Sequence, residues 1–140
     1  MDFKFKKKND TFSYYGMGKE ENYCDMNSHA KIGMYSSSAK EEYVPYIKPQ
    51  EHGNHTCTKL LKMDNGPTFV TNNQFEFRVS EFDDETLSNS LHTDEIKSNG
   101  YTNVRIDYKV SGIGSHSCGP VLDQKYQLKD KNFEFKFFIK

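Results

Sequence analysis

Apolar and polar residues alternate one by one in several short runs, and this alternation constrains the fold more than any other feature of the chain. In residues 104–110 Val, Ile and Tyr alternate with charged residues, and in residues 133–137 three phenylalanines alternate with Glu134 and Lys136. Period-two alternation is typical of a strand that buries one face. Because no βαβ rhythm separates these runs, the sequence predicts an all-β fold, an antiparallel β-sandwich with one short helix.

The same pattern predicts roughly eight to ten strands along the chain. Gly16 and Gly18 are expected to end the second strand, because glycine weakens a strand interior. Residues 43–47 surround Pro45, which restricts them to an edge or an extended segment. Strands are expected near residues 2–6, 11–15, 32–34, 56–63, 74–80, 104–110, 126–128 and 133–137.

One helix is expected at roughly residues 83–91. Asp83 or Asp84 would cap its N-terminus, where short acidic side chains accept hydrogen bonds from free backbone N–H groups. Leu87 and Leu91 lie four residues apart, so both are expected on the buried face of this helix.

Three glycines and Pro120 shape the segment 111–126, which lies between two of the predicted strands. Glycine permits positive φ and proline fixes φ, so the backbone of such a loop is constrained rather than random. Polar and sulfur side chains on a shaped loop above a sheet are typical of a ligand-facing edge. The central part of this glycine loop carries Ser115, His116, Ser117 and Cys118.

Two other groups of residues resemble catalytic or metal sites but are interpreted structurally. Neighbouring residues of a strand point to opposite faces, so Glu20 and Glu21 are not expected to act on one substrate. Asn22 and Asp25 are expected to bond turn backbone. The set His52, His55 and Cys57 lacks a helix that would present both imidazoles together, so a surface turn is preferred to a zinc site.

No complete catalytic set can be assembled from the sequence. His116 and Cys118 would share a face on an extended backbone, which leaves a cysteine nucleophile open, but no residue nearby would orient the imidazole. Gly16 and Gly18 lack the third glycine and the helix of a phosphate-binding loop. No catalytic residue and no metal ligand is therefore predicted on this chain.

Size and charge exclude several functional classes. The chain has 140 residues, and residues 1–140 are interpreted as one domain. Nineteen basic and 20 acidic residues give a net charge of −1, which argues against a nucleic-acid-binding protein. No window approaches the ~20 apolar residues of a membrane helix, and the N-terminus lacks an apolar signal core, so no membrane association is expected.

Cysteine usage and hydrophobic content indicate the compartment and the assembly. Three cysteines without a CxxC motif indicate reduced thiols in a cytoplasmic protein rather than a disulfide framework. Hydrophobic residues make up only 34% of the chain, although 11 Phe and 9 Tyr supply large side chains. Such a thin core indicates a piece of a larger sandwich, with apolar faces left exposed.

Three blocks of the sequence carry a resemblance to a known family. Residues 14–25 contain Gly-Met-Gly-Lys-Glu-Glu-Asn-Tyr-Cys-Asp, residues 43–54 contain Tyr-Ile-Lys-Pro-Gln-Glu-His-Gly-Asn, and residues 112–120 read Gly-Ile-Gly-Ser-His-Ser-Cys-Gly-Pro. These blocks, in this order, resemble the C-terminal end of the large bacterial β-galactosidases of glycoside hydrolase family 2. The chain is similar to the later part of the terminal domain of that family, a supersandwich like that of galactose mutarotases.

The resemblance implies a function for the whole enzyme rather than for this chain alone. It implies hydrolysis of terminal β-D-galactosides with retention, by two carboxylates in a barrel outside this chain. Magnesium and sodium would also bind elsewhere, so this chain would carry no cofactor. The glycine loop would reach the active-site wall, where Cys118, with His116 and Ser117 beside it, would line the sugar pocket. Cys118 stands where many relatives have tryptophan, so stacking on a sugar is not expected of it.

The expected partner is the rest of the β-galactosidase polypeptide, or a separate large subunit. The galactoside is expected to bind to the full enzyme. Two hypotheses from other classes stay open. One is a free-standing sugar-binding sandwich, which the absence of tryptophan disfavours. The other is a structural module that forms homo-oligomers.

Overall fold

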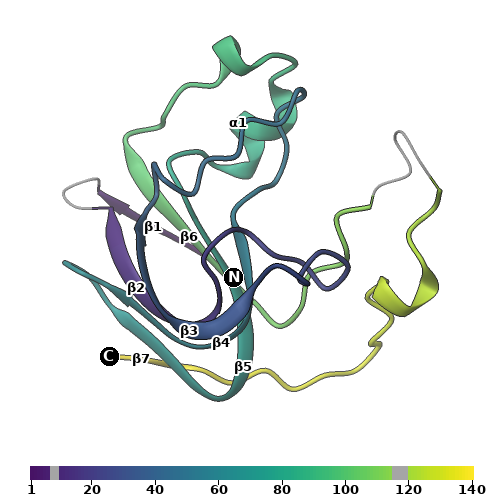
Figure 1. Ribbon diagram of the computed structural model, residues 1–140. Coiled ribbons are helices and arrows are strands. Elements are labelled where there is room, and N and C mark those ends of the chain that lie inside the picture. The colour runs from purple at the N-terminus through teal and green to yellow at the C-terminus, as the bar shows by residue number, and fades with distance from the viewer. Residues whose placement is uncertain (7–9, 115–119) are drawn as a thin grey trace.

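The structure is a computed structural model that describes residues 1–6, 10–114 and 120–140. Within these residues, seven strands form one antiparallel sheet in the order β1-β6-β5-β4-β2-β3, and β7 pairs with β5 (Figure 1). The all-β, antiparallel prediction is confirmed. The strands are β1 (Asp2–Lys6), β2 (Thr11–Gly18), β3 (Lys31–Ser38), β4 (Asn54–Met63), β5 (Thr68–Ser80), β6 (Tyr101–Asp107) and β7 (Phe138–Ile139).

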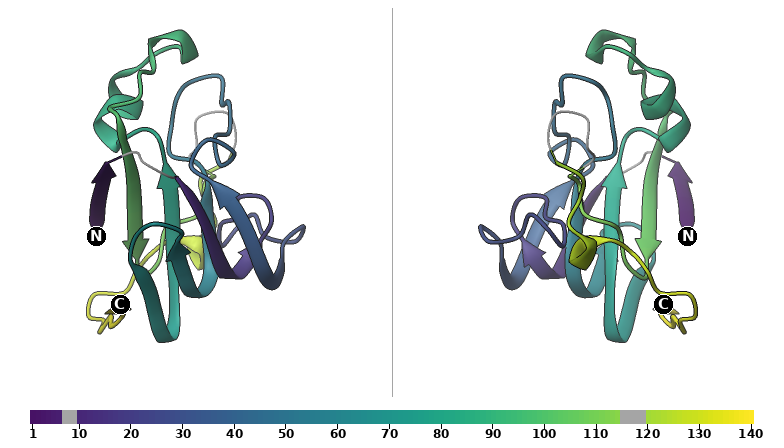
Figure 2. Two further views of the ribbon diagram at one scale, coloured as in Figure 1. Left: turned by 90° about the vertical axis from the view of Figure 1, so that its left-hand side faces the viewer. Right: turned by 90° about the vertical axis from the view of Figure 1, so that its right-hand side faces the viewer.

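The longest strand, β5, organises the sheet. One edge of β5 pairs with β4, while its other edge pairs with β7 near Phe69 and with β6 from Glu76 to Ser80. The sheet is strongly twisted, as the two side views show (Figure 2). One cluster of buried side chains therefore collects residues from four strands: Phe12, Tyr14, Leu61, Met63, Phe69, Phe75, Phe77, Val79, Val104 and Ile106.

Gly16 does not end β2, contrary to the prediction, whereas Gly18 is the last residue of the strand. A Cβ atom at Gly16 would lie 2.4 Å from the Thr58 hydroxyl oxygen, and one at Gly18 would lie 2.2 Å from the Tyr14 hydroxyl oxygen. These glycines are needed because neighbouring side chains lie directly over the strand, which continues through Gly16 as far as Gly18.

The C-terminal third contains less strand than the alternation predicts. β6 ends at Asp107, residues 124–126 form the 3-10 helix η2 (Gln124–Tyr126), and only Phe138 and Ile139 join the sheet after it. Phe135 and Phe137 instead pack against the core cluster as part of an unpaired segment. The predicted strands at 126–128 and 133–137 are therefore wrong, because aromatic packing without a hydrogen-bonded ladder produces the same alternation. Residues 43–47, for which an edge strand or an extended segment was left open, form no strand.

The predicted helix is present as α1 (Asp84–Asn89), followed by the 3-10 helix η1 (Thr93–Glu95). Asp83 is its N-cap and accepts a hydrogen bond from the Thr86 N–H at 3.0 Å. Leu87 is buried as expected, whereas Leu91 lies beyond the helix and is 61% exposed. None of the helices in the described residues has the length and apolar character that a bilayer crossing requires.

Candidate functional site

The side chains predicted to line a sugar pocket, Cys118, His116 and Ser117, lie outside the described residues. The two stalks of the glycine loop that leads to them, residues 110–114 and 122–128, are described. Hydrogen bonds close these stalks on one another: the Gly112 N–H donates to the Tyr126 carbonyl at 3.2 Å, and the Leu128 N–H donates to the Ser111 hydroxyl at 3.3 Å. We call this part of the structure the loop base.

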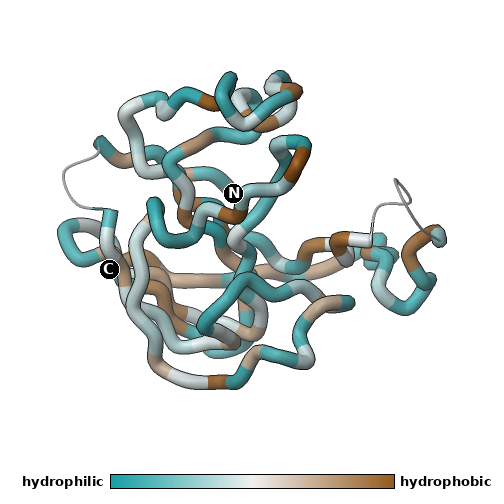
Figure 3. The backbone as a smooth tube through the Cα atoms, turned by 45° about the horizontal axis from the view of Figure 1, so that its top comes forward, coloured by the Kyte–Doolittle hydropathy of each residue, from teal (hydrophilic) through white to brown (hydrophobic). Residues whose placement is uncertain are grey.

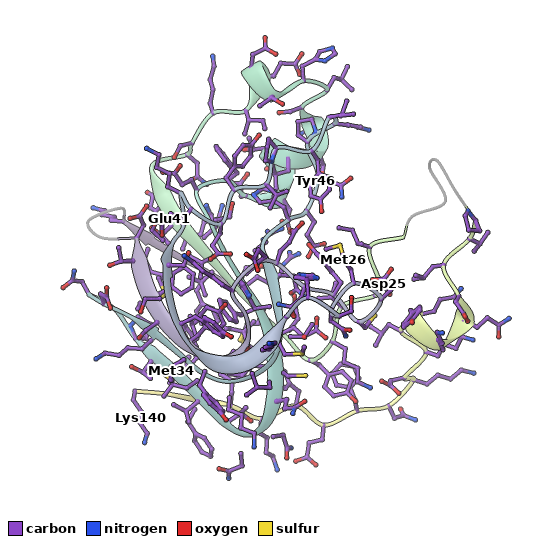
Figure 4. The ribbon with its side chains drawn as sticks, viewed as in Figure 1. Asp25, Met26, Met34, Glu41, Tyr46 and Lys140 are labelled. Carbon is purple, nitrogen blue, oxygen red and sulfur yellow. The ribbon has the colours of Figure 1, made fainter. Side chains whose placement is uncertain are left out.

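Asp25 fixes the loop base from the opposite side. Its two carboxylate oxygens accept hydrogen bonds from the N–H groups of Ile113 and Gly114, at 2.9 and 3.0 Å. A Cβ atom at Gly112 would lie 2.5 Å from the carboxyl carbon of Asp25, so only glycine fits there. Figure 4 shows Asp25 and the adjacent Met26 beside this segment. Asp25 was predicted to bond turn backbone, and the backbone it bonds is that of the glycine loop.

Cys24 contacts both stalks from the neighbouring position. Its thiol donates to the Tyr126 carbonyl at 3.4 Å and lies 3.8 Å from the Val110 carbonyl. Burial raises the pKa of this thiol, and the Asp25 carboxylate raises it further. A thiol with a raised pKa is a poor nucleophile, so Cys24 is a structural contact of the loop base.

The second block of the sequence is attached to the first through Glu21. This carboxylate accepts a hydrogen bond from the Gly53 N–H at 2.7 Å and another from the Tyr46 hydroxyl. Glu21 is buried, whereas its neighbour Glu20 is exposed. The structural interpretation of the two glutamates is confirmed, since they lie in different environments and Glu21 holds backbone.

Asn22 continues this attachment and is fully buried. Its amide donates to the carbonyls of Met17 and Glu20, and its side-chain oxygen accepts from both the N–H and the hydroxyl of Thr56. The Asn22 N–H also donates to the Asn54 carbonyl at 2.7 Å. Every hydrogen-bonding group of the Asn22 side chain is thus used, which explains how it is tolerated inside.

These contacts bring the three sequence blocks together at one place. Residues 20–25 form the centre, residues 46–54 attach to it through Glu21 and Asn22, and residues 110–114 attach through Cys24 and Asp25. A family model described as "Beta galactosidase small chain" matches residues 1–139. The chain belongs to the β-galactosidase small-chain family.

Curated relatives agree with this assignment. The chain is 39% identical over 132 residues to a β-galactosidase of Actinobacillus pleuropneumoniae, 34% over 133 residues to one of Kluyveromyces lactis, and 34% over 135 residues to one of Pseudoalteromonas haloplanktis. These matches cover 94%, 91% and 95% of this chain. The chain spans about 13% of the length of each of these three β-galactosidases.

In this member of the small-chain family, the expected surface turn around His55 is a buried cluster instead. His52 is 2% exposed and His55 is fully buried. The His55 Nε2 donates to the Glu42 carboxylate at 2.7 Å, and its Nδ1 lies 3.1 Å from the Tyr14 hydroxyl. The predicted surface turn around His55 is therefore wrong. The imidazole is tolerated inside the core because Glu42 and Tyr14 satisfy both of its nitrogens. No group of three or more potential metal ligands occurs within the described residues.

A groove of about 1030 Å³ lies between strands β4 and β5 and the C-terminal segment 124–130. Glu76 lines it and is only 8% exposed. Burial raises the pKa of Glu76 to about 7, against the opposing effect of a hydrogen bond from the Asn54 amide at 2.9 Å. This buried carboxyl group could not be identified from the sequence, because its alternating position in β5 indicates a solvent-facing residue.

Proposed function

We propose that this chain is the C-terminal, sandwich-forming segment of a glycoside hydrolase family 2 β-galactosidase and that it presents the glycine loop to the active-site wall. The observation that carries the proposal is the loop base. Asp25, Cys24 and Gly112 hold both stalks by hydrogen bonds and close packing. A loop fixed at its root in this way can bring its central residues to a substrate with little loss of entropy on binding.

The proposed enzyme hydrolyses terminal β-D-galactosides with retention. One carboxylic acid protonates the leaving oxygen and a second carboxylate forms the glycosyl intermediate. Both carboxylates belong to the remainder of the polypeptide or to a large subunit, as do the magnesium and sodium sites, and the assembly is cytoplasmic. Cys118, with His116 and Ser117 beside it, forms a wall of the sugar pocket rather than part of the catalytic pair.

A hybrid enzyme tests this proposal. In the A. pleuropneumoniae β-galactosidase, the segment that matches this chain is replaced by residues 1–140. The hybrid is expected to hydrolyse a chromogenic galactoside, and Cys118→Trp is expected to change KM more than kcat because a wall residue acts mainly in binding. A folded hybrid without turnover would contradict the proposal. The two controls are the unmodified enzyme and a variant from which the segment is deleted.

A free-standing sugar-binding module is the second candidate, and the groove beside Glu76 favours it. Side-chain amides can form hydrogen bonds with sugar hydroxyl groups, and tyrosine rings can pack on sugar faces. The groove is lined by residues of both kinds: Asn27, Asn72, Asn73, Gln74, Tyr108 and Tyr126. Galactose titrated into the isolated, isotope-labelled chain distinguishes the two candidates. Saturable shifts of the groove amides would favour the module, whereas unchanged spectra together with an active hybrid would favour the β-galactosidase segment.

A further inference from the structure

The first stalk of the glycine loop has a further attachment, at Val110, three residues after β6 ends. The backbone N–H of Val110 is a hydrogen-bond donor to the Glu76 carboxyl group, and both residues line the groove. The carbonyl oxygen of Val110 lies 3.8 Å from the Cys24 thiol. Val110 is therefore held from two sides at the root of the loop, and one of its two partners is a group that can carry charge.

Glu76 is itself held in place by Asn54, which is fully enclosed. The Asn54 amide donates to a Glu76 carboxyl oxygen at 2.9 Å and to the Asn22 carbonyl at 3.1 Å. A side-chain amide has two N–H donors, so both donors of Asn54 are used and its orientation is fixed. Hydrogen bonds thus lead from Asn22 through Asn54 and Glu76 to Val110, and they join the first two sequence blocks to the first stalk of the loop.

Strand β5 places this carboxyl group on the groove side of the sheet. Phe75 and Phe77 belong to the core cluster, so Glu76 between them points to the opposite face. Residues 124–130, which line the groove on its other side, are mostly hydrophilic, as the colours of Figure 3 show. Water can enter a polar groove of this size, so the carboxyl group can exchange its proton with solvent although the residue is only 8% exposed.

The titratable neighbours of Glu76 come from several elements. Burial is the main cause that opposes its ionisation, and two carboxylates add to it: Asp107, its register partner in β6, and Glu51, which precedes β4. The Cys24 thiol also faces Glu76, but burial raises the pKa of this thiol, so it stays neutral near pH 7. The charged residues that line the same groove are Lys59, Lys109, Lys125, Lys129, Asp130 and Glu134. Against burial and like charges, the two hydrogen bonds that Glu76 accepts favour its ionised form.

We propose that Glu76 is a positioning residue of the glycine loop: its carboxylate, held by Asn54, fixes Val110, and a proton on this carboxylate loosens the first stalk. The physical reason is that a charged acceptor forms hydrogen bonds roughly twice as strong as those of a neutral one. By linkage, a hydrogen bond that favours the ionised form becomes stronger when the proton leaves. The proposal rests on the proposed function, because the loop serves a sugar pocket only within the β-galactosidase.

A positioning role and a purely structural role of Glu76 differ in the direction of their pH dependence. Ionisation of a buried carboxyl group lowers the stability of the whole fold, so a structural role predicts that the loop base is loosest at high pH. The positioning role predicts the reverse. The first stalk is expected to be held most tightly above the pKa of Glu76, which is about 7, and to loosen below it. The two directions can be measured separately, because local opening and global unfolding are different events.

A pH titration of the isotope-labelled chain by NMR tests the attachment of Val110. Its amide proton is expected to move downfield as pH rises, with the same midpoint as the Glu76 carboxyl carbon, because the hydrogen bond strengthens. Asp107→Asn removes a like charge and is expected to lower both midpoints equally. Glu76→Gln is expected to abolish the Val110 titration, whereas the control Glu134→Gln leaves it unchanged. A Val110 shift that moves upfield, or that does not follow the Glu76 midpoint, would overturn the proposal.

The pH dependence of KM in the A. pleuropneumoniae hybrid tests the effect on the sugar pocket. At pH 6, where Glu76 is mostly protonated, Glu76→Gln is expected to have nearly the same KM as the unsubstituted hybrid. At pH 8 the KM of the variant is expected to be roughly fivefold higher, with kcat changed by less than about twofold, because only the unsubstituted hybrid has the charged acceptor. Titration of the other groups of the enzyme is common to both proteins and cancels in the ratio of their KM values.

The outcomes separate this proposal from the proposed function. The same ratio of KM values at pH 6 and pH 8 would overturn the positioning role of Glu76 and leave the proposed function standing. An inactive, folded hybrid would overturn the proposed function, and the NMR titration of the isolated chain would still decide whether Glu76 holds Val110.

Discussion

At the scale of single residues, one carboxylate sets the position of the glycine loop. Asp25→Ala removes both acceptors from the Ile113 and Gly114 N–H groups. Hydrogen bonds to a charged group contribute about 1.5–3 kcal/mol each, so the loop base is expected to open more often. Hydrogen exchange of the Ile113 and Gly114 amides is expected to accelerate by roughly tenfold or more. Asp123→Ala, which removes the cap of η2 elsewhere in the loop, is the control.

Unchanged exchange at both amides in Asp25→Ala would show that the stalks hold themselves together without this carboxylate. In the hybrid enzyme, the same variant is expected to raise KM for the galactoside, because a loosened loop costs ordering entropy when substrate binds. Asp25→Asn keeps one acceptor oxygen and is expected to give an intermediate effect on both measurements.

A second prediction concerns the buried carboxyl group of Glu76. Its folded-state pKa of about 7 lies above the usual 4.5 because burial disfavours the charged form. The folded state therefore binds a proton more tightly than the unfolded state, and stability falls as pH rises from 4.5 to 7. The total loss is about 3 kcal/mol for a shift of this size.

Glu76→Gln stays neutral and can still accept the Asn54 hydrogen bond. The free energy of unfolding of this variant, relative to the unsubstituted chain, is expected to rise steadily between pH 4.5 and 7, as measured by urea denaturation. The buried His52 has a lowered pKa and acts in the opposite direction, but it is present in both proteins and cancels in the comparison. The exposed Glu134→Gln serves as control, and an identical pH profile for Glu76→Gln would refute the buried-charge argument.

Residue roles were predictable from the sequence where a local rule decided them. Cap chemistry predicted Asp83 as an N-cap candidate for the helix, whereas the backbone partners of Asp25, Ile113 and Gly114, lie 88 and 89 residues away rather than in its own turn. Long-range partners were not predictable, because the hydrogen bonds of His55 to Glu42 and Tyr14 span 13 and 41 residues. The pocket-wall role of Cys118 stays a prediction, since its position lies outside the described residues.

At the scale of elements, Gly16 of β2 and its register partner Gly33 of β3 allow the effect of close packing to be tested apart from the effect of β propensity. A Cβ atom at Gly16 would lie 2.4 Å from the Thr58 hydroxyl oxygen and 3.0 Å from its Cα atom, so the backbone of β4 itself obstructs it. For a Cβ atom at its register partner Gly33, the three nearest atoms all belong to the Tyr35 side chain, at 3.0–3.1 Å, and that side chain can move. Gly16→Ala is therefore expected to destabilise the chain by about 1–3 kcal/mol.

Gly33→Ala is the matched control, and its unfolding midpoint in urea is expected to stay close to that of the unsubstituted chain. Both substitutions remove a glycine from a strand interior, so their shared gain in β propensity cancels. If Gly16→Ala were as stable as Gly33→Ala, the close contact between β2 and β4 would not be the reason that β2 contains glycine.

Alternation predicted the interior strands well and the C-terminal ones poorly, for a physical reason. In β5 the alternating Phe75, Phe77 and Val79 are buried and also pair in the sheet. In residues 133–137 the same pattern reflects aromatic packing alone, with Phe133 stacked on Tyr108 at 4.5 Å and no ladder. Periodicity reports which side chains lie on the same side of the backbone, and it does not report whether the backbone pairs.

At the scale of the whole molecule, the low apolar content and the apolar side chains exposed on the sheet face opposite the core describe the same property. The chain fills one core with phenylalanine and tyrosine, yet it leaves Met34, Ile32 and Phe138 open on the far face. The sequence predicted that apolar faces would remain exposed, but it could not identify the face. That required the register of five strands, which depends on pairings between residues as far apart as Val70 and Phe138.

The last prediction is that the isolated chain hydrolyses no galactoside. Retaining hydrolysis requires two carboxyl groups about 5–5.5 Å apart that face one sugar. The groove contains Glu76, but the other two carboxylates that line it, Asp130 and Glu134, pair with Lys109 and Lys136 at the surface. Turnover of a chromogenic galactoside by the purified chain is therefore expected to equal that of a mock preparation.

The Glu76→Gln variant makes this test specific. Any residual turnover that disappears in Glu76→Gln would arise in the groove and would contradict the division of labour proposed for the enzyme. Residual turnover that Glu76→Gln leaves unchanged, and that falls with further purification, would come from host β-galactosidase. Activity that appears only in the hybrid would mean that this chain positions the wall of the sugar pocket and that the remainder of the polypeptide supplies the catalytic carboxylates.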